Sequence, residues 1–169
     1  MGLIITTSNV FKIAYPTLVV PHQPGPDVKP KFSVLAMFPK TNIGNISGLE
    51  PTLDEVCYSQ WKMSFAEATA PGMGINYPPS FKDGDLKYLK DANKKPIKGS
   101  IDPATAGMWL MSLKNSKPIS VFDQKGFYVD PKSIYAGCWA RARVECLAYQ
   151  GTYGSVIALK LLSIQMVDK

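Results

Sequence analysis

The sequence predicts a mainly β protein, α+β by the count of its elements, with the pattern of a small barrel. About six segments are rich in β-branched and aromatic residues, and one segment has the spacing of a helix. That helix falls between early strands, which is typical of an α+β domain or a small barrel. The 169 residues are 46% hydrophobic and 19% charged, so we expect one domain, residues 1–169, with a sizeable core.

The first part of the chain predicts two strands joined by a constrained loop. Residues 9–20 are rich in β-branched and aromatic types and form a strand that Pro16 breaks. Residues 21–30 contain four prolines and a glycine, which favour a loop of low conformational freedom. Residues 31–40 form a strand that Pro39 ends, and its two largely apolar faces indicate a central strand.

The one main helix is expected after residue 51. Thr52 is a candidate N-cap, and Glu55 three residues later completes the pattern of a capping box. Apolar residues then recur at helical spacing as far as Phe65. We expect this helix to cover one end of the sheet.

Residues 70–103 predict a long inserted loop, because this segment is rich in lysine, proline and glycine. A loop of this length in a small domain is usually functional or mobile. Aromatic residues alternate there with lysines: Tyr77, Phe81 and Tyr88 with Lys82, Lys87 and Lys90. The segment is therefore either a binding arm or a solvated linker.

Strands are expected again in the second half of the chain, at residues 106–115 and 118–123. The last strand, 155–167, follows a glycine-containing hairpin turn at residues 150–154. A long strand over residues 133–149 precedes that turn.

The strand at residues 133–149 is the most informative segment, because its alternate side chains form two unlike faces. The first face is small and apolar, as a packed interior requires: Ala136, Cys138, Ala140, Ala142, Val144, Cys146 and Ala148. The second face is polar and aromatic: Tyr135, Gly137, Trp139, Arg141, Arg143, Glu145, Leu147 and Tyr149.

Arg141 and Arg143, the only arginines of the chain, lie side by side on that second face next to Trp139. Two neighbouring guanidinium groups favour an anion across them, and flat aromatic rings stack on bases, so single-stranded nucleic acid meets both conditions. The alternative is a solvated sheet face in which Glu145 neutralises Arg143 and the tryptophan belongs to the core.

The charge of the chain also favours an anionic partner. The net charge is +6, and lysine supplies all but two of the 19 cations. Lysine suits contact with phosphates of any sequence better than bidentate reading of bases. Three cysteines, no CxxC pair and a single histidine, His22, favour neither a disulfide framework nor a zinc site. We expect no metal, no cofactor, no signal peptide and no membrane-spanning segment.

Three segments together resemble the phage single-stranded DNA-binding protein family: FSVLAMFPK, FKDGD, and SIYAGCWARARVECLAY with the strand after it. The segment NSKPISVFD fits the same pattern, and the resemblance extends from residue 31 to residue 167. It implies a five-stranded OB-fold barrel that binds a single strand across one sheet face. It also implies a non-enzymatic role in DNA replication and recombination, in the cytoplasm of the bacterial host.

The resemblance also implies the site and the partners. Trp139, Arg141 and Arg143 would lie in the binding face, Lys40 would border it, and Lys82 would be a further contact. From the aromatic residues and the inserted loop we add Tyr135, Tyr149, Tyr77, Phe81 and Lys87 as candidate contacts. Single-stranded DNA is the expected partner, with phage replication proteins as further partners, and the protein is expected to be a monomer or a weak homo-oligomer.

Two observations keep other interpretations open. Many proteins of this class end in an acidic tail, whereas this sequence has one acid in its last twenty residues. Either such a tail lies beyond this sequence or partners are recruited otherwise. The alternatives are a decoration β-barrel of a phage particle, and a metal-dependent nuclease that uses Asp83 and Asp85.

Overall fold

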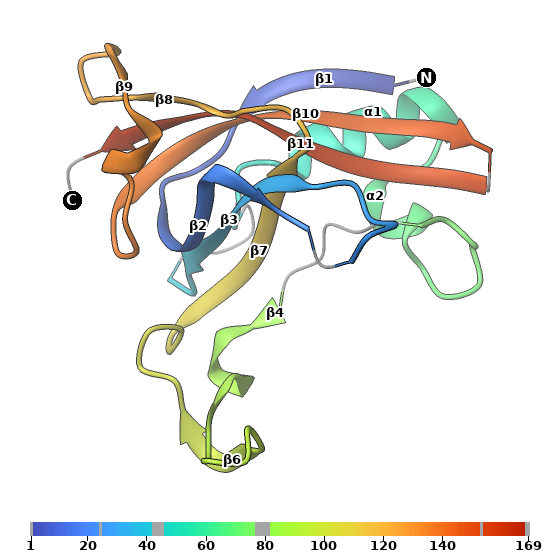
Figure 1. Ribbon diagram of the computed structural model, residues 1–169. Helices are drawn as coiled ribbons and strands as arrows, with labels where there is room; N and C mark the ends of the chain where they lie inside the picture. The colour runs from blue at the N-terminus through green and yellow to red at the C-terminus, as the bar shows by residue number, and fades with distance from the viewer. Residues whose placement is uncertain (1, 24, 42–45, 77–81, 153, 168–169) are drawn as a thin grey trace.

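The computed structural model describes residues 2–23, 25–41, 46–76, 82–152 and 154–167. Within them, a nine-stranded sheet curls around one core, a two-stranded hairpin stands apart, and two short α-helices lie on one side (Figure 1). The prediction of a mainly β fold with one main helix is confirmed.

The sheet has a strand order that differs from the chain order. Along it lie β4, β7, β3, β2, β10, β11, β8 and β9, and β1 pairs with β10. β11 runs beside β7, where the Asn115 side chain donates a hydrogen bond to the Leu161 carbonyl at 3.0 Å. The bounds are β1 (Gly2–Thr7), β2 (Phe11–His22), β3 (Lys31–Pro39), β4 (Lys82–Asp83), β7 (Met108–Asn115), β8 (Ser120–Phe122), β9 (Tyr128–Val129), β10 (Trp139–Gly151) and β11 (Gly154–Val167).

β10 has the two faces that the sequence predicts. Five alternate residues on its inner side are completely buried: Ala140, Ala142, Val144, Cys146 and Ala148. Arg141 and Arg143 are exposed on the other side. Leu147 departs from the pattern, because it is only 5% exposed although it belongs to the outer face.

The prediction that this strand begins at Ser133 is wrong. A 3₁₀ turn, η2 (Pro131–Ser133), and a turn at residues 136–137 precede β10, which begins at Trp139. Gly137 has a φ of +100°, a conformation that favours glycine, and its N–H donates to the Ile13 carbonyl. As a result, Tyr135 is 67% exposed beside the strand, and Ala136 is exposed and not part of the core.

The main helix, α1 (Glu50–Trp61), begins earlier and ends earlier than predicted. Its N-cap residue is Leu49, which provides no side-chain cap, so Thr52 lies inside the helix and is not its cap. Ser47 and Glu50 instead bond with one another just ahead of the first turn. The Ser47 hydroxyl accepts from the Leu49 N–H, and the Glu50 carboxylate accepts from the Ser47 N–H.

The end of α1 is set by Lys62, which has a left-handed backbone with a φ of 60°. Phe65, predicted to lie in the main helix, opens a separate short helix, α2 (Phe65–Ala68), which Ser64 caps. α1 packs against β1 and β10. It therefore covers the sheet on the side opposite the exposed arginines.

β2 continues through Pro16 as far as His22, so the predicted break is wrong. The register with β3 nevertheless shifts between Ala14 and Thr17. Tyr15, inside that shift, has a φ of +45°, which is unusual for a residue other than glycine. The strand accommodates Pro16 by an irregularity and does not end there.

The segment 70–103 is not a simple loop. Its described part contains β4, a 3₁₀ turn η1 (Gly84–Leu86), and the hairpin of β5 (Tyr88–Lys90) and β6 (Pro96–Ile101). Figure 1 shows this hairpin projecting away from the sheet. We call residues 84–101 the arm.

The N-terminal strand β1 was not predicted, although its residues are β-branched and apolar. It pairs with β10 over its whole length, from Gly2 opposite Ala148 to Thr7 opposite Arg143. The three cysteines, Cys57, Cys138 and Cys146, are free and buried, as expected of small apolar core residues.

Candidate nucleic-acid interface

Residues from five strands share one outer face of the sheet, because directly opposed residues of antiparallel strands point to the same side. One row crosses β10, β2, β3, β7 and β4 in turn, and it joins residues far apart in sequence. It runs through Trp139, Lys12, Met37, Leu110 and Lys82. We call the surface around this row the outer face.

The centre of the outer face is apolar. Ala14, Met37 and Leu110 are 7%, 2% and 5% exposed, and Leu35 and Met108 pack against them. Lys12 and Lys82 therefore flank an apolar floor, in which the half-buried Leu35 and Met108 are the members accessible to the flat, weakly polar faces of bases.

Two adjoining cavities of about 310 and 270 Å³ extend the outer face to the far ends of β3 and β7. Lys31, Ser112 and Lys114 line both of them. Tyr149 and Lys160 line the larger cavity, and Lys29 and His22 line the smaller one, whereas no acidic residue lines either. We call these two cavities the lysine groove.

The lysine groove and the apolar floor are continuous along β7. Lys114, Ser112 and Leu110 occupy alternate positions of that strand and so face the same side. At ~3.4 Å per residue, Lys114 and Leu110 are separated by about 14 Å along the strand. A chain crossing this surface would meet cations first and an apolar floor next.

The arginine pair extends the outer face along β10 beyond Trp139, which is half-buried. Arg141 and Arg143 line a small cavity of about 220 Å³ together with Gln165, Ser163 and Phe122. Among the described residues neither arginine forms an ion pair, and Glu145 lies opposite Lys160 on β11. Neutralisation of Arg143 by Glu145, the alternative considered above, is therefore not observed.

The other predicted contacts are distributed around this surface. Tyr149 lines the lysine groove, Lys82 lies in the row with Trp139, and Tyr135 is exposed in the segment before β10. Tyr77 and Phe81 lie outside the described residues.

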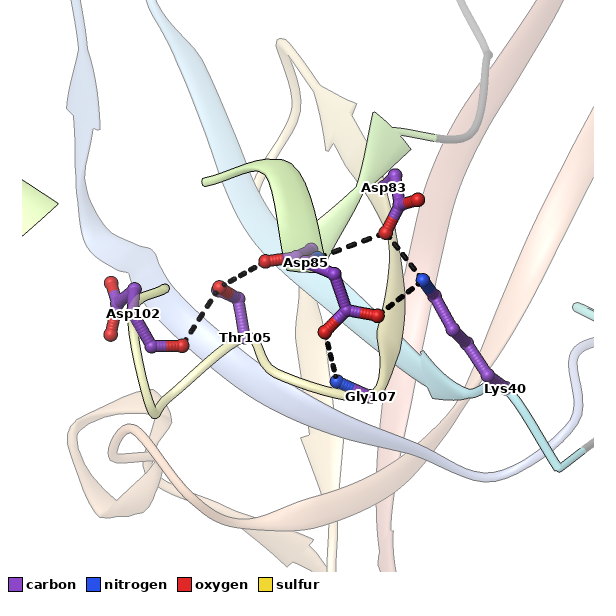
Figure 2. A network of polar contacts seen from close by, with 7 residues as sticks. Lys40, Asp83, Asp85, Asp102, Thr105 and Gly107 are labelled. Carbon is purple, nitrogen blue, oxygen red and sulfur yellow. Dashed lines mark hydrogen bonds and ion pairs between the residues drawn. The ribbon is translucent and has the colours of Figure 1, made fainter. Parts of the chain in front are cut away.

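Lys40 forms ion pairs with the carboxylates of Asp83 and Asp85, at the base of the arm (Figure 2). Its ammonium group donates to Asp83 Oδ1 and, at 2.6 Å, to Asp85 Oδ2, and it lies 4.7 Å from the centre of the Trp109 ring. The second oxygen of Asp85 accepts from the Gly107 N–H at 2.9 Å. Lys40 thus joins the end of β3 to the base of the arm.

Asp83 and Asp85 were also the residues of the nuclease interpretation. Their oxygens hold Lys40 and backbone N–H groups, which leaves this pair as an anchor for the arm. Among the residues that the structure describes, no group of three or more His, Cys, Asp or Glu side chains is placed to hold a metal ion.

The Lys40 network stabilises the anchor only in the range of pH in which Lys40 and both aspartates are charged. Hydrogen bonds from Lys40 lower the pKa of Asp83 and Asp85 from 3.8, and the same two carboxylates raise the pKa of Lys40 from 10.5. The aspartates therefore stabilise the fold above their unfolded pKa, and this contribution disappears as the pH falls through their lowered values. The contribution of Lys40 is complete below 10.5 and disappears as the pH rises through its raised pKa.

We expect Lys40→Met to lower the free energy of unfolding near neutral pH, because it leaves two carboxylates without their cation. The difference from the wild type should shrink as the pH falls well below 3.8, where both aspartates become protonated. Urea unfolding at a series of pH values measures it, with the exposed Lys125→Met as a control. A difference that does not vary with pH would assign the effect to packing of the lysine stem on Trp109.

Several residues of this surface were not predicted from the sequence. Lys12, Lys31, Lys114 and Lys160 belong to four different strands, and Tyr15 follows Lys12 on β2. Alternation within the predicted strands places Lys114 on the same side as Ser112, but only the pairing of strands brings the four lysines to one surface.

The structure thus defines an open, OB-like β barrel with a basic outer face, and comparison with known proteins agrees. The chain belongs to the family described as Enterobacter phage Enc34, ssDNA-binding protein, whose model matches residues 3–169. The predicted family resemblance is confirmed, and the family is one of DNA-binding proteins rather than nucleases or decoration barrels. A comparison with curated protein sequences gives no match.

Solved structures show the same fold. The single-stranded DNA-binding protein from bacteriophage Enc34 in complex with ssDNA is 23% identical, with a TM-score of 0.63 over 99% of this chain and 87% of that chain. The gp2.5 single-stranded DNA-binding protein encoded by bacteriophage T7 is 16% identical, with a TM-score of 0.56 over the same shares of the two chains. Across the described residues, no helix is long and apolar enough to cross a membrane.

Proposed function

We propose that this protein binds single-stranded DNA without sequence preference and protects it during phage DNA replication and recombination, in the cytoplasm of the bacterial host. The observation that carries the proposal is the lysine groove, which leads along β7 onto an apolar floor edged by Trp139. Cations that follow a phosphate backbone beside surfaces for base contact are the common arrangement of proteins that bind single strands.

Each part of the outer face has a role in this proposal. Lys31, Lys114 and Lys160 contact phosphates, and the Tyr149 ring at the wall of the groove stacks on a base. On the other side, Trp139 stacks on a base, and Arg141 and Arg143 continue the phosphate path along β10. OB folds bind oligonucleotides across the corresponding face of the barrel, which supports this assignment.

The absence of sequence preference follows from the type of contact. Lysine acts on phosphate as a point charge, and a stacked ring accepts any base because every base has a π face. The cations of the groove are lysines, and the two arginines are exposed at a shallow site that they share with an aromatic residue, Phe122. Phage replication proteins would be further partners, bound outside this face.

The test is competition between single-stranded and duplex DNA for the protein bound to a labelled oligonucleotide. The single strand should compete far better, and the logarithm of the binding constant should fall linearly with the logarithm of salt concentration, by about 0.7 for each phosphate contacted. Equal competition by duplex DNA would overturn the proposal. Cleavage of the oligonucleotide on addition of Mg²⁺ would instead support the nuclease interpretation.

A further inference from the structure

Tyr15 is presented at the surface by an irregularity in β2. Ala14 lies opposite Leu35 and Thr17 lies opposite Ser33, and both pairs face outward. Three steps along the chain separate these two outward residues, where a regular strand would take two or four, so the backbone absorbs an extra residue there. Tyr15 occupies that position with a φ of +45°, and 62% of the residue is exposed.

A lysine from the arm covers the exposed ring. Lys87 Nζ lies 4.4 Å from the centre of the Tyr15 ring and donates a hydrogen bond to its hydroxyl at 3.0 Å. A cation therefore already lies against the ring, and both of its contacts are made to this one exposed side chain. Such a contact is easily exchanged, because surface interactions of this kind contribute little free energy.

The backbone that carries Lys87 is firmly placed. The Lys87 carbonyl accepts from the Asp102 N–H at 2.8 Å, and the Thr105 hydroxyl donates to the Gly84 carbonyl at 2.9 Å. A Cβ atom at Gly84 would lie 2.1 Å from the Thr105 carbonyl oxygen, so the turn packs directly on backbone. With Lys40 holding Asp83 and Asp85, the base of the arm is fixed, whereas the Lys87 side chain is held, among the described residues, by its contacts with Tyr15.

We propose that Tyr15 and Lys87 form a nucleotide subsite at the edge of the outer face, in which a base stacks on the Tyr15 ring and Lys87 turns to the adjoining phosphate. This subsite rests on the proposed binding of single-stranded DNA and extends it toward the arm. The free protein keeps the ring covered by Lys87, and the incoming base takes the place of the ammonium group.

The subsite directs the strand onto the arm. Four exposed lysines follow Lys87 in β5, β6 and their turn, namely Lys90, Lys94, Lys95 and Lys98. Asp91, the one acid between them, accepts hydrogen bonds from the N–H groups of Asn93 and Lys95, so its carboxylate is used to build the turn. The arm therefore carries positive charge onward from Lys87, the lysine that contacts Tyr15.

The experiment compares Tyr15→Gly with Tyr15→Phe in fluorescence anisotropy titrations of a labelled oligothymidine. Glycine removes the ring and suits the left-handed backbone, so the variant should remain folded, whereas phenylalanine keeps the ring and loses only the bond from Lys87. We expect about tenfold weaker binding for Tyr15→Gly, near wild-type binding for Tyr15→Phe, and a salt slope reduced by about 0.7 for Lys87→Gln.

The matched control is a second exposed tyrosine–lysine pair, on α1. Tyr58 is 61% exposed, and Lys62 Nζ lies 5.4 Å from the centre of its ring, but α1 is not part of the outer face. Tyr58→Ala should bind as the wild type does. Wild-type affinity of Tyr15→Gly would overturn the subsite and leave the proposed function intact, whereas failure of the wild type to bind single strands would overturn the proposed function.

A second measurement keeps the test decisive if a Tyr15 variant does not fold. Oligonucleotides with single 5-iodouracil substitutions, irradiated in complex with the wild-type protein, should crosslink to Tyr15, because the reaction favours a stacked aromatic ring. Peptide mapping locates the crosslink. Crosslinks confined to other residues, such as Tyr149 and Trp139, would contradict the subsite while supporting the rest of the path.

Discussion

Replacement of Lys31, Lys114 and Lys160 together by glutamine is expected to lower the affinity for single-stranded DNA by about a hundredfold. Each exposed lysine is assigned about 1 kcal/mol of charged contact, and about 3 kcal/mol corresponds to two orders of magnitude in the dissociation constant. The three side chains are exposed in the lysine groove, so the fold should not depend on them. The salt slope should also fall by about two.

A matched triple variant separates this groove from the general positive charge of the protein. Lys62, Lys125 and Lys132 are exposed and lie outside the groove and the arm, so their joint replacement by glutamine removes the same charge. It should weaken binding much less than the groove variant. Equal losses from the two variants would mean that the net charge, and not the groove, determines affinity.

The Ala142→Arg variant is expected to be the most destabilising single change, with a loss of several kcal/mol that leaves little folded protein. Ala142 is completely buried, and its N–H and carbonyl groups bond with Ser8. An arginine at this position would place a charge among apolar neighbours with no acid to pair with it. Circular dichroism and urea unfolding measure the loss.

The control for this change is one residue away. Arg143 is exposed on the opposite side of the same strand, so Arg143→Ala should alter the unfolding midpoint little while it weakens DNA binding. Opposite results for the two variants would mean that the faces of β10 are reversed. Trp139 would then belong to the core and the arginines to a solvated edge.

The faces of β10 were predictable because the signal is local. Alanine, valine and cysteine alternate there with arginine and glutamate, and this pattern predicts the inner and outer sides without any knowledge of neighbouring strands. The same reasoning failed at Ala136, where a turn stabilised by a hydrogen bond to Ile13 replaces the strand. That bond joins two segments that are distant in sequence, so no local sequence pattern predicts it.

The capping of α1 shows how two local signals compete. Both Ser47 with Glu50 and Thr52 with Glu55 match a capping box, and they lie five residues apart. In the structure the helix starts after Leu49, which is completely buried in the core and provides no side-chain cap, and the Ser47 and Glu50 bonds lie ahead of the first turn. Tertiary packing of Leu49, which neither sequence pattern contains, therefore sets the start of the helix.

The lysine groove could not be predicted, since its members come from separate strands. Lys31 begins β3, Lys114 is the last but one residue of β7, and Lys160 lies within β11. Each resembles an ordinary solvated strand residue in the sequence. Their convergence depends on the contact between β7 and β11, and the exposed ring of Tyr15 depends on an irregularity that Pro16 only suggests.

The pairing of the N-terminal strands with β10 has a consequence for how the chain folds. Ser8 and Ala142, which bond with one another through their backbones and the Ser8 hydroxyl, are 134 residues apart in sequence. The entropy cost of closing such a long loop comes before the contact contributes any stabilising free energy. Folding of topologies of this kind therefore takes about milliseconds to seconds. During synthesis, β1 must remain unpaired until β10 has emerged from the ribosome, whereas β2 can pair with β3 as soon as that strand is made.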